Sequence, residues 1–197
     1  PSTIVPAAAG IYAAGDTVVL NQSLAIIPLG MLVNGIFLSV WIYAPSRFER
    51  FKSPLFLTTL SALAVWCLFG ILMLFGVELA LESGWSAFEI GVLGLFLLIV
   101  LAVAMNWKVQ ATPKGKHPVA RRVLLIRGSA AASAIGAAVW LSFQGQPLIA
   151  GLAAVFPAIF LTSMVALWHA QGPTVPQGAA GPMTLGGASV AIYALVA

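Results

Sequence analysis

The residues best placed to bind a solute lie around two prolines, Pro28 and Pro157, that interrupt long apolar runs. A proline inside a helix removes one i→i−4 hydrogen bond and bends the helix, which frees a backbone carbonyl. Uncharged polar residues surround both prolines: Asn21, Gln22 and Asn34 near the first, and Thr162 and Ser163 near the second. Amides and hydroxyls beside such a kink either bind a small polar solute or bond between neighbouring helices. Because none of them is charged, the solute we expect is uncharged or zwitterionic.

Enzymatic chemistry is not indicated by the remaining reactive side chains. A hydrolase or a metal enzyme needs several His, Asp, Glu or Cys side chains that converge on one site. The chain has five acidic residues, two histidines and the single Cys67. His117 falls in a basic linker and His169 at the end of an apolar run, so the two are poorly placed to share a ligand. We therefore expect no enzyme activity, no metal site and no cofactor.

The apolar runs that carry the two prolines are long enough to cross a membrane. Hydrophobic residues make up 61% of the 197 residues and charged residues only 7%, more apolar surface than a soluble domain of this size can bury. A membrane-spanning helix needs ~20 apolar residues, and the runs show no strand-like alternation. We therefore predict an all-α, polytopic transmembrane bundle of about six spans, at 17–43, 54–80, 87–107, 123–143, 147–168 and 182–197. The segment 1–16 is expected to lie at the interface.

The basic residues are confined to two linkers, after the first and third predicted spans. The first linker holds Arg47, Arg50 and Lys52; the third region holds Lys108, Lys114, Lys116, Arg121, Arg122 and Arg127. The intervening linker region has Glu78 and Glu82 but no Lys or Arg. Basic residues beside helix ends orient the chain and contact anionic headgroups, so we expect lipid rather than nucleic acid as the partner. Both cationic linkers then face the cytoplasm, and the N-terminus lies on the other side of a bacterial inner membrane or an organelle membrane.

A similar spacing of proline and tryptophan occurs twice in the sequence, which suggests an internal repeat. Pro28 is followed by Trp41 and then Pro54, and Pro157 is followed at similar spacing by Trp168 and Pro182. This layout of kink proline, interfacial tryptophan and helix-starting proline predicts a parallel repeat of four spans, cut off after the sixth. We accordingly expect the sequence to be part of a longer chain. The alternative is that proline and interfacial tryptophan are simply common in membrane helices.

The fifth predicted span also resembles a known family. Gly151-Leu152, Phe156-Pro157, His169 and Gly172 are similar to the Gly-Leu…Phe-Pro…His…Gly pattern of GlpM-type small inner-membrane proteins, which look similar to the drug/metabolite transporter superfamily. The resemblance covers about twenty-five residues and implies a bundle of short apolar helices in repeated units. It implies no particular solute.

Two functions remain open from the sequence. The first is a transporter that moves a small solute through a site formed by Asn21, Gln22, Pro28, Asn34, Pro157, Thr162 and Ser163. The second is a non-catalytic subunit, whose spans serve as packing surface in a homo-oligomer or a larger membrane assembly. The scarcity of ionisable groups inside the predicted spans favours the second.

The charge distribution makes a prediction about topology. Protease accessibility in sealed vesicles should place the linkers around Lys52 and Lys114 on the same side of the membrane, because both carry the orienting charges. Cleavage of the two linkers from opposite sides would contradict the predicted spans.

Overall fold

The structure, a computed structural model, describes residues 17–107, eight positions between 122 and 140, and residues 156–196, with side chains from residue 26 onward. In these ranges the chain forms helices and no strand: α2 (Thr17–Phe48), α3 (Pro54–Glu82), α4 (Ala87–Asn106), α7 (Ala158–Gln171) and α8 (Thr174–Val196). The predicted segment 1–16 and most of the predicted span 123–143 lie outside the described residues, as do 147–155 of the fifth span. The all-helical prediction is therefore confirmed for the described ranges.

Four of these helices are long and apolar enough to cross a membrane: Ile26–Phe48 within α2, and the whole of α3, α4 and α8. Helix α7 is also apolar but has only 14 residues. Such helices are the mark of an integral membrane protein. The described residues thus contain four candidate spans and one shorter helix, and they do not confirm the predicted six spans or the repeat.

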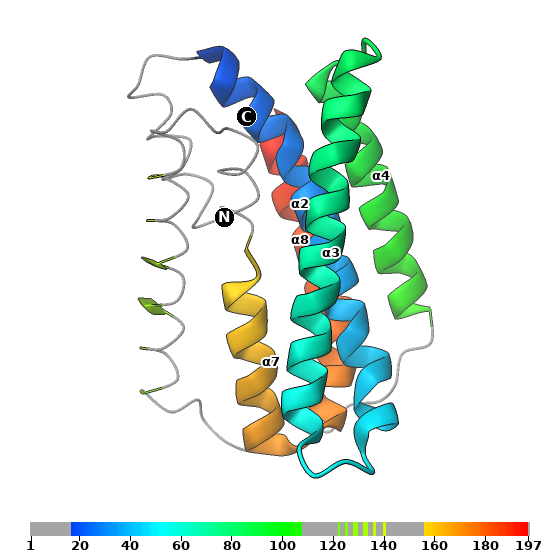
Figure 1. Ribbon diagram of the computed structural model, residues 1–197, viewed down its shortest axis with the longest axis vertical. Coiled ribbons are helices and arrows are strands. Elements are labelled where there is room, and N and C mark those ends of the chain that lie inside the picture. The colour runs from blue at the N-terminus through cyan, green and yellow to red at the C-terminus, as the bar shows by residue number, and fades with distance from the viewer. Residues whose placement is uncertain are drawn as a thin grey trace.

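Helix α2 lies at the centre of the bundle. It makes extensive contacts with α3, α4 and α8, whereas α3 and α4 barely touch each other. Figure 1 shows α3 in front of α2 and α8, with α4 and α7 on opposite sides. In the most apolar stretch of each helix, 61% of the residues are buried in α2, 39% in α8, 28% in α4 and 22% in α3. The outer helices therefore use one face for α2 and leave the other to their surroundings.

Small residues let these helices approach α2 closely. An ideal Cβ on Gly94 of α4 would lie 2.9 Å from the side chain of Leu29 and 3.0 Å from its backbone nitrogen. On α2, a Cβ on Gly35 would lie 3.0 Å from both Leu101 and Thr184, which belong to α4 and α8. Membrane helices gain no hydrophobic energy by associating in lipid, so close van der Waals contact of this kind must hold them together.

The outward faces of α3 and α4 are bulky and apolar. Large exposed side chains run along both helices: Phe56, Leu60, Leu68, Phe69, Ile71, Leu72, Phe75 and Leu79 on α3, and Phe88, Val92, Leu93, Phe96, Leu97, Val100 and Val103 on α4. On α3 the buried residues Thr58, Ala62, Trp66 and Gly70 recur every fourth position, which is the stripe that faces α2. A water-soluble bundle would not expose so much apolar surface, and lipid is its natural cover.

Both α3 and α4 begin with residues that suit the start of a helix. Pro54 occupies the first turn of α3, where its missing N–H costs nothing. Helix α4 begins with a capping box: the Ser86 hydroxyl accepts from the Glu89 N–H at 3.2 Å, and the Glu89 carboxylate accepts from the Ser86 N–H at 2.8 Å. Glu89 therefore caps its helix at the bundle's end.

Three expectations for the chain around α7 and α8 were wrong. Pro157 is the N-cap of α7 and not a kink inside a helix, whereas Pro28 does lie inside α2. Pro182 was expected to start the last span, but α8 begins at Thr174 and contains Pro182. The residues expected to form a linker before Pro182 are therefore largely helical. A proline is tolerated inside a membrane helix when neighbouring groups satisfy the freed carbonyl.

The tryptophans of the proposed repeat also differ from expectation. Trp41 was expected at the lipid interface but is fully buried, and its ring meets that of Trp168 edge-on with centroids 6.3 Å apart. A large aromatic side chain in this position packs α2 against α7. The two tryptophans therefore serve as packing groups in the described bundle.

The close approach at Gly94 makes a prediction about stability. Gly94→Ala should lower the free energy of unfolding by about 1–3 kcal/mol, because the added methyl group meets the backbone of α2 and must push the helices apart. Thermal unfolding in detergent, followed by circular dichroism, measures the effect.

The matched control is Gly76→Ala on α3, where a Cβ meets nothing within 4 Å. This variant should be as stable as the parent or slightly more so, because alanine favours helix over glycine. Equal effects at the two positions would contradict the close contact.

Candidate functional site

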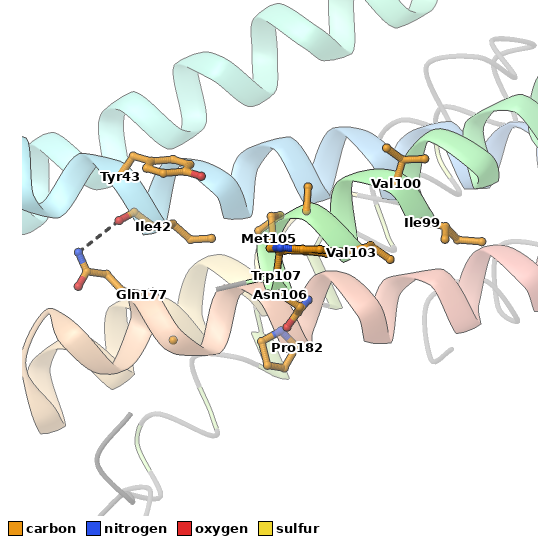
Figure 2. A pocket seen from close by; sticks show the side chains of 13 residues that line it. Ile42, Tyr43, Ile99, Val100, Val103, Met105, Asn106, Trp107, Gln177 and Pro182 are labelled. Atoms are coloured by element: carbon orange, nitrogen blue, oxygen red, sulfur yellow. Dashed lines mark hydrogen bonds between the residues drawn. The ribbon is translucent and has the colours of Figure 1, made fainter. Parts of the chain in front are cut away.

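A cavity of about 960 Å³ opens between α2, α4 and α8. It lies where α2 and α4 end and α8 begins, the same end of the bundle as the exposed Arg47, Arg50 and Lys52. Figure 2 shows the lining side chains converging from the three helices. They are Ile42, Tyr43, Ile99, Val100, Val103, Ala104, Met105, Asn106, Trp107, Gln177, Gly178, Gly181 and Pro182. A space of this size is typical of a small-molecule site.

Four side chains in the described lining carry polar atoms: Tyr43, Asn106, Trp107 and Gln177. The Gln177 Nε2 donates to the backbone carbonyl of Ile42 at 3.3 Å, the dashed line in Figure 2. The Asn106 Nδ2 donates to the carbonyl of Ala102 at 2.7 Å. Each bond uses one of the two N–H donors of its amide and leaves the second N–H and the carbonyl oxygen.

Asn106 also fixes the contact between α4 and α8. An ideal Cβ on Gly181 would lie 2.8 Å from the Asn106 Oδ1 and 3.1 Å from its Nδ2. A glycine at this position leaves room for the amide where it stands, whereas a larger residue would require Asn106 to shift. In this part of the cavity wall, the Asn106 side chain of α4 therefore packs against the backbone of α8 at Gly181.

Charge is missing from the described wall of the cavity. Its lining includes no Asp, Glu, Lys, Arg or His side chain. A bare ion needs a counter-charge or several oxygen ligands to leave water. Over the described ranges, moreover, no group of three or more His, Cys, Asp or Glu side chains could hold a metal ion. The arrangement therefore suits a neutral or internally compensated solute.

The helices pack tightly around Gly35, beside the cavity. An ideal Cβ on this glycine would lie 3.0 Å from Leu101 of α4 and from Thr184 of α8. Thr184 is buried, and its hydroxyl donates to its own helix at the Ala180 carbonyl, 2.9 Å away. The three helices are therefore in close contact at the level where Ile99 and Val100 of α4 line the cavity.

The site residues predicted from the sequence lie elsewhere, on α2 and α7. Asn34 is buried on α2, and its Oδ1 accepts from the Trp66 Nε1 at 2.9 Å. The Trp66 ring in turn meets Phe156 edge-on, with centroids 5.2 Å apart. This chain of contacts joins α2, α3 and the start of α7. Asn34 therefore bonds between helices, one of the two roles left open by the sequence.

The two hydroxyls expected near Pro157 bond within their own helix. Thr162 donates to the Ala158 carbonyl at 2.7 Å, and the buried Ser163 donates to the Ile159 carbonyl. Both satisfy carbonyls of the first turn of α7 rather than pointing donors into the cavity. Pro28 and Pro157 are themselves fully buried. Asn21 and Gln22 lie on the first turns of α2, and their side chains are outside the described residues.

The orienting cations are only partly described. Arg47, Arg50 and Lys52 are exposed at the turn between α2 and α3, as snorkelling or headgroup contact requires. Arg122 is exposed as well. Lys108, Lys114, Lys116, Arg121 and Arg127 fall outside the described residues.

Sequence reasoning missed Asn106, Gln177 and Gly181. Gln177 and Gly181 were assigned to a linker, and Asn106 was read as the end of a span. A signal was present, because an amide beside a small residue in an apolar run marks close helix contact. What the sequence could not supply was the pairing of α4 with α8.

The Trp66 contact makes a prediction about stability. Trp66→Phe removes the indole N–H but keeps a ring against Phe156, so unfolding should become easier by about 0.6–1.7 kcal/mol, the range for hydrogen bonds between membrane helices. Thermal unfolding in detergent would detect this loss.

Trp85→Phe is the matched control, because Trp85 is exposed between α3 and α4. It should leave the unfolding temperature unchanged. If Trp66→Phe were as harmless as this control, the hydrogen bond to Asn34 would contribute nothing.

Comparison of the chain with protein-family models, with curated proteins and with solved structures found no match. The resemblance to GlpM-type proteins therefore stays a prediction, and the function has to be argued from the site itself.

Proposed function

We propose that this integral membrane protein carries a small uncharged or zwitterionic solute, which binds in the cavity between α2, α4 and α8. The observation that supports this proposal is the cavity itself: about 960 Å³, lined mostly by apolar side chains with Tyr43, Trp107 and two amides as polar groups, and with no charged residue in its described wall. Sites for small molecules combine a largely apolar lining with a few placed polar groups.

The amides narrow the class of solute. Gln177 and Asn106 each use one N–H to bind a backbone carbonyl, so each amide keeps its oxygen as an acceptor and a second N–H as a donor for a ligand. A solute that offers N–H or O–H donors would replace its water contacts there at little cost. Small amides, polyols and amino acids share this chemistry, whereas a simple inorganic ion does not.

The close packing of the helices favours a carrier rather than an open pore. Leu98 and Leu101 of α4 and Thr184 of α8 lie close to Gly35 of α2, so the three helices are in contact beside the cavity. A carrier would alternate between this conformation and one that opens toward the other end. Pro28 lies on α2, seven residues before Gly35. A proline inside a helix favours a bend, so α2 could bend there.

Filling the cavity should stop transport. Ala104 lines the cavity, so Ala104→Phe places a ring where the solute would bind. Because overpacking costs about 1–3 kcal/mol and each 1.4 kcal/mol is tenfold, solute flux below saturation should fall by about tenfold or more. The assay is stopped-flow light scattering of proteoliposomes with glycerol, urea and glycine as probes and potassium chloride as the charged control.

Ala64→Phe is the control, because Ala64 is exposed on α3 and does not line the cavity. It should leave the flux unchanged at equal protein content. Flux of all probes no faster than in empty liposomes, or equal flux in the two variants, would contradict the proposed site.

A second candidate is a non-catalytic subunit of a membrane assembly. The wide apolar face of α3 favours this candidate. Only 22% of the residues in the most apolar stretch of α3 are buried. Such a face suits another transmembrane helix as well as lipid. Native-gel migration after mild solubilisation distinguishes the candidates, because a subunit should travel with fixed partners and a carrier as a monomer or homo-oligomer.

A further inference from the structure

In the part of the chain that the structure describes, two buried polar side-chain atoms on neighbouring helices have no hydrogen-bond partner. They are the Trp41 Nε1 on α2 and the Thr58 Oγ1 on α3, and both residues are fully enclosed. A buried N–H or O–H that finds no partner loses the hydrogen bonds it makes to water in the unfolded chain and so destabilises the fold. Nearly all such groups in folded proteins are satisfied by protein or by bound water.

The pairing of α2 with α3 sets the two atoms at the same level. The hydrogen bond between Asn34 and Trp66 fixes the antiparallel register of these helices. Moving seven residues along α2 reaches Trp41, and moving eight back along α3 reaches Thr58. Thr58 also belongs to the buried stripe of α3, with Ala62 and Trp66, that faces α2. Trp41 and Thr58 therefore lie at the same level of the α2–α3 pair, two turns from the hydrogen bond between Asn34 and Trp66.

A backbone carbonyl on the same residue also lacks its usual helical donor. Pro45 is inside α2 and has no N–H, so the carbonyl of Trp41, four residues earlier, cannot accept the i→i−4 hydrogen bond. Water commonly enters a helix ladder at such a position. Trp41 thus offers an indole donor and a carbonyl acceptor, and Thr58 on α3 offers a hydroxyl that can act as either.

We propose that one water molecule binds between α2 and α3 at this level. It accepts a hydrogen bond from the Trp41 Nε1, donates one to the Trp41 carbonyl, and bonds the Thr58 hydroxyl. An internal water typically makes about three hydrogen bonds to otherwise unsatisfied groups, and this set supplies three. The water would join α2 to α3 near the cation-rich end of the bundle, as Asn34 and Trp66 do further in.

The test measures Thr58→Val in two backgrounds. In the otherwise unchanged protein, this nearly isosteric substitution removes one partner of the water, so the unfolding midpoint should fall by about 2–4 °C. In the Trp41→Phe background the water has already lost its indole donor, and Thr58→Val should lower the midpoint little or even raise it. Thr59→Val, the adjacent residue, should cause the same shift in both backgrounds.

Other results would overturn the proposal. A rise in the midpoint for Thr58→Val alone would mean that the hydroxyl is simply unsatisfied. An equal fall in both backgrounds would mean that it bonds its own helix, for example the Pro54 carbonyl, and shares no ligand with Trp41.

A direct measurement covers the case in which Thr58→Val does not fold. In detergent-solubilised protein with ¹⁵N-labelled tryptophan, the Trp41 indole signal, assigned with Trp41→Phe, should receive magnetisation from a long-lived bound water. Transfer to the exposed Trp85 and not to Trp41 would contradict the site.

Discussion

Close contact between helix backbones is the constraint on which this bundle depends. In hydrocarbon, burying a leucine against another helix gains little, so association has to come from van der Waals fit and hydrogen bonds. Gly94 places α4 against the backbone of α2 at Leu29, and Gly181 lets Asn106 of α4 lie on α8. These contacts use the small residues of the helices. The bulky residues of α3 and α4 therefore lie on the outward faces.

The same constraint determines where polar groups are used and where a solute could enter. Asn34 bonds to Trp66 between α2 and α3, whereas Thr162 and Ser163 bond to carbonyls of their own helix α7. The cavity lies between α2, α4 and α8, at the end that carries the exposed cations. The proposed binding site therefore uses other amides, Asn106 and Gln177, than the one that joins α2 to α3.

Some helix starts can be predicted from the sequence by local rules, whereas others cannot. The starts of α3 and α4 follow from local rules, because Pro54 suits a first turn and Ser86 with Glu89 forms a capping box. The start of α8 does not, since Pro173, Pro176 and Pro182 all compete, and proline is also tolerated inside membrane helices. The roles of Asn34 and Asn106 depended on which helices meet. An amide in an apolar run indicates contact but not its partner, so the candidate site could not be located from sequence.

If the bundle is packed in this way, lipid covers the outer helices while α2 stays enclosed. Nitroxide labels placed one by one at positions 67–79 of α3, in liposomes, test it through collision rates with oxygen and with a water-soluble nickel chelate. We expect oxygen collisions to follow a helical period, with minima at Gly70 and Val77 and maxima near Phe75 and Leu79, and few nickel collisions. Frequent nickel collisions along the stretch, or no periodicity, would contradict the account.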